Sequence, residues 1–170
     1  MMTLRRIIGL PLLLVLFAAS AYGQSPDEKI RALTQELKTA PDDESLRRRL
    51  LDYAGSRKPE FPVPEEARRL LVRGNTSRSY AKKPGEYARS IQLYKEALEI
   101  APWWAEAYAN LAQSFELSNQ FNEAINSWNY YLLTRPAKEA ARQAQDNIYS
   151  LEEKIYAEHK VHDAPQKKSP

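Results

Sequence analysis

The chain has 170 residues, of which 25 are lysine or arginine, 22 are aspartate or glutamate and none is cysteine. A formal net charge of +3 is too small to indicate a nucleic-acid-binding protein, which needs a dense basic face. Without cysteine, no disulfide stabilises the fold and no acylated cysteine anchors the chain to a membrane.

The start of the chain has the layout of a secretory signal peptide. Arg5 and Arg6 precede an apolar run over residues 7–19, and small residues at a cleavable spacing end at Ala21 and Gly23. An uncleaved anchor is the weaker alternative, because a membrane span needs roughly 20 apolar residues. We expect cleavage after one of these two residues, a periplasmic or secreted protein, and no membrane span afterwards. Loss of both arginines lowers the basic count from 25 to 23, against 22 acids.

Residues 24–57 predict a short N-terminal helical hairpin, with helices over about 26–54. Apolar residues recur at helical spacing in both halves, as Ile30, Leu33 and Leu37 and then as Leu46, Leu50 and Leu51. Pro41, with Asp42 and Asp43 after it, ends the first helix and caps the second. The arginines at 47–49 are interpreted as a solvated face balanced by nearby acids. A patch for anionic lipid or an acidic partner is the alternative.

Residues 58–64 predict a stiff connector. Pro59, Pro62 and Pro64 keep the chain extended and prevent a helix. A ligand for a proline-recognising domain is the sharper alternative, but a linker is the better interpretation. The main domain then covers 65–158, and we expect a disordered tail over 159–170.

The main domain contains an internal repeat of helical character, and no alternating strand pattern appears in it. Pro102 and Pro136 are 34 residues apart, a period typical of stacked helical hairpins. Between them the apolar and small positions are Tyr108, Leu111, Ala112 and Phe115 in one helix, then Phe121, Ala124, Ile125 and Trp128 in the next. Thirty-four residues before the later positions Phe121, Ile125, Trp128, Tyr131 and Leu132 stand Tyr87, Ile91, Tyr94, Ala97 and Leu98.

These two copies in register resemble the tetratricopeptide (TPR) repeat, as found in exported bacterial proteins. The resemblance implies an all-α fold of stacked antiparallel helical hairpins, a short solenoid, with a C-terminal capping helix. The apolar stripe of that last helix is Ala141, Ala144, Ile148, Leu151 and Ile155. If the N-terminal hairpin packs on the repeats, we expect it at the opposite end of the array from this helix.

Departures from the family pattern are also visible. Ser90 and Tyr131 stand where the family has a small alanine. The first helix of the earlier copy, roughly 65–80, matches poorly. Aligning Gly74 with Ala112 needs an insertion of about four residues before Gly85.

Residues with catalytic chemistry are scarce. His159 and His162 are the only histidines, and with Asp163 they form at best a solvated cluster in the tail rather than a metal site. The five glycines form no phosphate-binding loop. We therefore expect no enzyme activity, no metal and no cofactor. The pair Trp103-Trp104 is interpreted as turn residues packed partly on Tyr108, rather than as a stacking platform for sugars or bases.

The resemblance implies a protein-binding role, since the first helices of such repeats line a concave surface that holds a peptide or helix. The predicted partner-binding residues are Glu106, Ala109, Asn110, Gln113 and Glu116. If the turn before the next helix is one residue shorter, that helix adds Arg142, Asp146 and Tyr149. Residues 96–134 contain five acids and no base, so a basic protein segment is the expected partner. The predicted function is a non-catalytic scaffold or adaptor of the cell envelope. The alternatives are a structural subunit of a homo-oligomer and an accessory subunit of an envelope enzyme complex.

Overall fold

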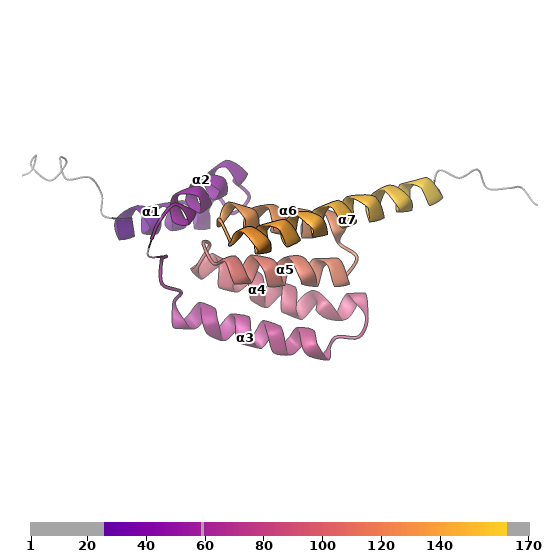
Figure 1. Cartoon of the computed structure of the whole chain (residues 1–170). Helices are drawn as coiled ribbons and strands as arrows, with labels where there is room; N and C mark the ends of the chain where they lie inside the picture. Colours follow the sequence, from indigo (N-terminus) through magenta and orange to yellow (C-terminus); the bar gives the residue numbers. More distant parts are fainter. Residues whose placement is uncertain (1–25, 59, 163–170) are drawn as a thin grey trace, which may run out of the picture.

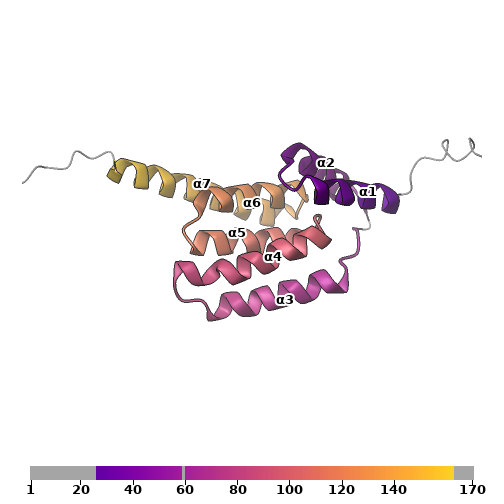
Figure 2. The same cartoon turned by 180° about the vertical axis from the view of Figure 1, so that it is seen from behind.

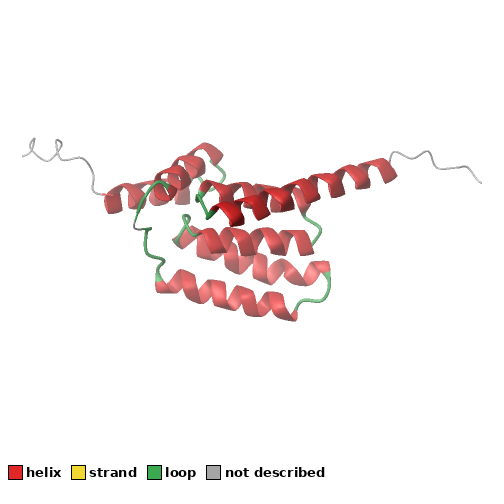
Figure 3. Cartoon of the chain, viewed as in Figure 1, coloured by secondary structure: helices red, strands yellow, loops and turns green. Residues whose placement is uncertain are grey.

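A computed structural model describes residues 26–58 and 60–162, and helices account for most of this part of the chain (Figures 1 and 3). No strand occurs in the described ranges. The α-helices are α1 Pro26–Thr39, α2 Glu44–Gly55, α3 Glu65–Tyr80, α4 Ala88–Ile100, α5 Ala105–Leu117, α6 Phe121–Leu133 and α7 Lys138–His162, with a 3₁₀ turn η1 at Pro84–Tyr87.

Local chemistry explains where these helices begin and end. The Asp43 carboxylate accepts a hydrogen bond of 2.9 Å from the backbone N–H of Leu46 and caps α2, and this bond holds the pKa of Asp43 below its usual value. Asn119 and Arg135, with φ of 61° and 59°, end α5 and α6 in the left-handed conformation typical of helix C-termini.

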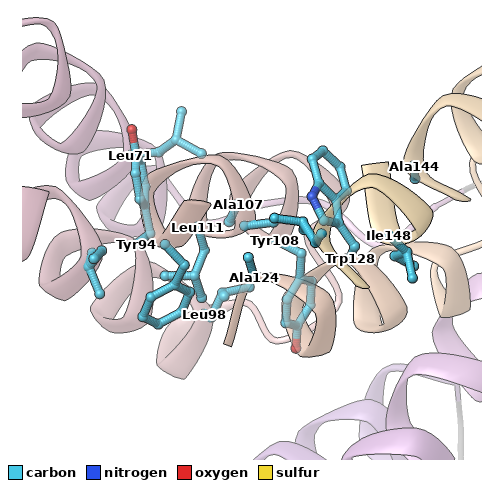
Figure 4. Close-up of a cluster of buried hydrophobic side chains, with 14 of the residues drawn as sticks. Leu71, Tyr94, Leu98, Ala107, Tyr108, Leu111, Ala124, Trp128, Ala144 and Ile148 are labelled. Atoms are coloured by element: carbon cyan, nitrogen blue, oxygen red, sulfur yellow. The ribbon is translucent and has the colours of Figure 1, made fainter. Parts of the chain in front are cut away.

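The helices α3 to α7 form a stack of antiparallel hairpins. Helix α3 packs on α4, α5 on α6, and α4 and α6 in turn contact the next helix in the chain (Figures 1 and 2). Tyr94, Leu111 and Trp128 come from successive layers and meet in a single core (Figure 4). The expectation of an all-α fold of stacked hairpins with a terminal helix is confirmed.

Gly74 settles the register of the earlier copy. A Cβ at this position would lie 2.5 Å from Cε1 of Tyr94, so only glycine lets α3 and α4 approach this closely. Tyr94 stands 34 residues before Trp128, and Ala112 is buried in the core that contains Trp128. The residues that the earlier copy has in addition to the later one lie in two places. Helix α3 has 16 residues against 13 in α5, and the connection after it, at 81–87, is longer than the one after α5.

The expectation that the N-terminal hairpin lies at the far end of the array is wrong. Helix α1 contacts α4 and α2 contacts α6, so the hairpin lies across the second helices of both repeats. Leu51 belongs to the main core, and Asp52 forms a 2.6 Å ion pair with Arg135. A Cβ on Gly55 would lie 2.9 Å from the carbonyl oxygen of Leu133, which shows how closely α2 approaches the end of α6.

The connector after α2 contains no helix and is packed rather than free. The half-buried Phe61 ring lies between the rings of Tyr53 and Trp103, at centroid distances of 6.2 and 5.9 Å. These contacts fix the path of the chain from the hairpin into α3.

Helix α7 buries one side and then runs beyond the rest of the stack (Figures 1 and 2). Ala144, Ile148 and Leu151 are buried, as the predicted apolar stripe requires. The helix continues to His162, so the expectation of disorder from residue 159 onward is wrong for its first four residues. Residues 1–25, which include the predicted signal peptide, and residues 59 and 163–170 lie outside the described part. None of the described helices is long and apolar enough to span a bilayer.

Candidate functional site

Helix α5 is at the centre of the stack and has two different sides. Its apolar side buries Tyr108, Leu111 and Phe115. On its polar side Glu106 and Gln113 are exposed and lie seven residues apart, about two helical turns. The repeat pattern predicted this separation of the two sides.

The neighbouring first helices flank the polar side of α5. Arg78 of α3 donates a 2.6 Å hydrogen bond from Nη1 to Oε1 of Gln113. Lys154 of α7 forms a 2.7 Å ion pair with Glu116. These contacts join α3, α5 and α7 into one continuous face, which we call the first-helix face.

Two of the predicted site residues are less accessible than expected. Asn110 is only 9% exposed, and Ala109 is half-buried against the core. They shape the first-helix face but offer a partner little side-chain surface. Glu106, Gln113 and Glu116 are the members of the predicted α5 set that remain on the surface.

The structure does not bring Arg142, Asp146 and Tyr149 to the first-helix face. All three are exposed, but they lie on the side of α7 opposite its buried residues. The physical reason is the register: the buried Ala144 and Ile148 stand 34 residues after the buried Asn110 and Ser114.

This register gives the three residues a different role. Arg142, Asp146 and Tyr149 occupy the positions of Tyr108, Ala112 and Phe115, which in the complete repeat pack against its own second helix. Within the described residues no helix follows α7, so these positions face outward. Lys154, which the sequence did not single out, is the α7 residue that reaches α5.

A hollow of about 890 Å³ lies on the other side of α5 and was not expected from the sequence. Helices α4 and α6 form its walls, the apolar side of α5 its floor, and the turn between α1 and α2 one end. Leu111 and Phe115 contribute to the floor and Leu98 to the α4 wall, while Lys95, Glu99, Glu123 and Asn126 lie on the rim. The pattern could not reveal it, because the hairpin that frames it was placed elsewhere.

Arg47 connects the hairpin to this hollow. Its Nη1 donates a 3.4 Å hydrogen bond to the hydroxyl of Tyr108, its Nη2 donates a 2.8 Å bond to the carbonyl of Pro41, and its guanidinium lies 5.4 Å from the Tyr130 ring centroid. Burial raises the pKa of both tyrosines. Arg47 is therefore a structural contact, whereas Arg48 and Arg49 are exposed as predicted for a solvated face.

The tryptophan pair packs in the turn before α5. Trp103 is half-buried and its ring lies 5.9 Å from that of Phe61, while Trp104 is half-buried against the core cluster that contains Tyr108. The indole Nε1 of Trp103 is buried and has no hydrogen-bond partner in the described part of the chain. A stacking platform for sugars or bases would need exposed rings, and these are not exposed.

No group of three or more metal-binding side chains comes together among the described residues. The tail cluster of His159, His162 and Asp163 is not covered by this finding, since Asp163 and the side chain of His162 lie outside the described part.

Comparison with known proteins adds a partial likeness. No family model and no solved structure matches the chain. A curated relative described as the uncharacterized protein ycf37 of Cyanophora paradoxa is 36% identical over 66 residues. The matched stretch is 39% of this chain and 38% of the relative, so the chain spans about two fifths of that relative's length. The likeness covers part of each chain and names no activity.

Proposed function

We propose that the chain is a TPR-type adaptor of the cell envelope that binds a segment of a partner protein and catalyses no reaction. The observation that carries this proposal is the first-helix face, where α3, α5 and α7 present polar side chains side by side on a rigid stack. Surfaces of this kind hold extended peptides or helices in helical repeat proteins.

The charges of this face favour a basic partner segment. Glu106 is exposed and forms no ion pair within the described ranges. The contacts Gln113–Arg78 and Glu116–Lys154 are on the surface, where such pairs contribute only about 0–1 kcal/mol to stability. A partner can therefore replace them at small cost. A lysine or arginine that meets Glu106 and Glu116 would set both orientation and encounter rate.

The hollow beneath the N-terminal hairpin is the second candidate surface. It has an apolar floor and a charged rim, which is the composition of many binding pockets, and its volume lies within their usual range of roughly 300–1,000 Å³. A partner that inserts an apolar side chain would use it in preference to the first-helix face.

Site-specific photo-cross-linking in the native host tests both surfaces at once. A photoreactive amino acid is placed at position 106 or 113 for the first-helix face, at position 126 for the hollow, and at position 138 as an exposed control. A discrete cross-linked protein from positions 106 and 113 alone supports the proposal. Cross-links from 126 alone move the site to the hollow, and the absence of cross-links from all positions contradicts an adaptor function.

Export is part of the same proposal and rests on the leader pattern. The intact mass of the protein from an envelope fraction is expected to correspond to a chain that begins at Tyr22 or Gln24. A membrane-bound form that retains Arg5 and Arg6 would contradict export by a cleaved signal peptide.

A further inference from the structure

We propose that the two ends of the helical stack bind each other, so that a second copy of the chain continues the array head to tail. The proposal concerns the outer faces of α3 and α7. It does not depend on the partner site at the first-helix face.

Exposed large apolar side chains concentrate at the two ends of the stack. Val72 and Tyr80 on α3 are 59% and 77% exposed, and Tyr149 and Tyr156 on α7 are 60% and 61% exposed. Leu117, at the end of α5, is the remaining one among the described residues. Exposed apolar side chains that gather on one face are typical of interaction sites, whereas singly scattered ones are common on any surface.

The α3 end combines apolar surface with positive charge. A shallow groove of about 340 Å³ between α3 and α4 is lined by Val72, Arg73, Thr76, Ser77, Arg89 and Leu93. Leu93 is buried at its base, while both arginines are exposed and form no ion pair in the described part of the chain. The groove therefore fits a side chain that is apolar and is flanked by carboxylates.

The α7 end has the complementary pattern. Tyr149 and Tyr156 are seven residues apart and so lie on the same side of the helix. Asp146, Glu152 and Glu153 accompany them, and the exposed Arg142, also on this side, is the one lysine or arginine in residues 139–153. The three carboxylates form no ion pair with any described residue. The side of α7 that lacks a following helix is thus aromatic and carries more acidic than basic residues.

The α3 end of one copy is complementary to the α7 end of another copy, but not to a second α3 end. If α7 of one copy lies in the α3–α4 groove of the next, its tyrosines meet Val72 and Leu93, and its acids meet Arg73 and Arg89. Two α3 ends would bring arginines together, and opposite charges across a contact favour the correct pairing. The contact is heterologous, since different surfaces meet, and it therefore allows open chains of copies.

Sedimentation velocity of the purified full chain, from micromolar to millimolar concentration, provides the test. The wild-type chain is expected to form dimers and longer species that weaken as salt increases. Val72→Asp/Arg89→Asp blocks the α3 end, and Tyr149→Asp/Tyr156→Asp blocks the α7 end. Each variant is expected to associate at least about tenfold more weakly alone. Leu117→Asp is the matched control, an exposed apolar residue away from both faces, and should associate as the wild type does.

Mixing the two blocked variants distinguishes this arrangement from other dimers. Each blocked chain keeps one intact end, so an equal mixture should form a 1:1 heterodimer that grows no further. A wild-type chain that stays monomeric throughout the range overturns the proposal. So does an α3-blocked variant that still dimerises alone, which would indicate pairing of α7 with itself. Thermal melts identify loss of fold: the substituted side chains are exposed, so every variant should melt close to the wild type.

Discussion

The two helical hairpins α3–α4 and α5–α6 solve the same packing problem with different residues. In the later hairpin the small residue is Ala112 and the large one is Trp128, and in the earlier hairpin they are Gly74 and Tyr94. Glycine opposite tyrosine brings the helices so close that no Cβ fits between them. The comparison shows that the repeat conserves the pairing of a small with a large side chain, and not the identity of either.

The largest effect is expected from Ala124→Arg in the later hairpin. Ala124 is fully buried, so arginine would overpack the core and bury an unpaired charge. We expect the free energy of unfolding to fall by about 4 kcal/mol or more. Thermal or denaturant unfolding measures this, with the exposed Asn126→Arg on the same helix as the control. A variant that unfolds as the wild type does would show that the register of the repeat is wrong.

The earlier hairpin is expected to be sensitive at Gly74. Alanine is the better helix former by about 1 kcal/mol, but its Cβ would meet the buried ring of Tyr94 at 2.5 Å. We expect Gly74→Ala to destabilise by about 1–3 kcal/mol, the usual cost of overpacking. Gly85→Ala is the matched control, because nothing lies within 4 Å of its added Cβ. Gly74→Ala that is more stable than the wild type would contradict the close contact.

The contact between the N-terminal hairpin and the stack should depend on Arg47. Arg47→Ala removes hydrogen bonds to Tyr108 and Pro41, and we expect a loss of about 1 kcal/mol in unfolding free energy. Arg48→Ala, at an exposed neighbour, should change it by less than about 0.5 kcal/mol. Equal losses of unfolding free energy from the two substitutions would mean that Arg47 does not stabilise the contact between the hairpin and the stack.

Stability at alkaline pH tests the burial of three tyrosines in the stack. Burial raises the pKa of Tyr94, Tyr108 and Tyr130 in the folded state above the unfolded value of about 10. The folded state then holds more protons than the unfolded state at high pH. The contribution of these tyrosines to the free energy of unfolding is therefore fully present below about pH 10 and is lost as the pH rises further. Tyr108→Phe should reduce this slope in urea titrations at several pH values, and an unchanged slope would show that Tyr108 ionises freely.

The smallest effects are expected on the first-helix face. Glu116→Lys breaks the ion pair with Lys154 and should cost about 0.5–1 kcal/mol, whereas Glu106→Lys should stay within about 0.5 kcal/mol of the wild type. Chemical denaturation measures both. A larger loss from Glu106→Lys than from Glu116→Lys would mean that α5 is rotated from the orientation described.

The sequence predicted the helices and the core of the repeat because both follow from local pattern. Prolines at 102 and 136 mark the helix ends, and the spacing of Tyr108, Leu111 and Phe115 marks the buried side. The place of the N-terminal hairpin could not be predicted, since it depends on long-range contacts such as Asp52 with Arg135 and Leu51 with the core. No periodicity encodes such contacts.

The candidate site was predictable only in part. Glu106, Gln113 and Glu116 follow from the helical spacing of α5. Arg142, Asp146 and Tyr149 were assigned to the same face because a turn one residue shorter was assumed, and the buried positions of α7 show that the 34-residue register continues instead. Lys154 lies beyond the length of one repeat helix, so the repeat gave no reason to consider it.

Binding of the cross-linked partner segment to two matched variants tests the proposed function most directly. Glu106→Lys changes the first-helix face, Asn126→Lys changes the rim of the hollow, and both residues are exposed. We predict that Glu106→Lys slows association and weakens affinity by about tenfold or more at low salt, while Asn126→Lys binds as the wild type does. Wild-type affinity for Glu106→Lys together with lost binding by Asn126→Lys would contradict the proposal and assign the partner to the hollow.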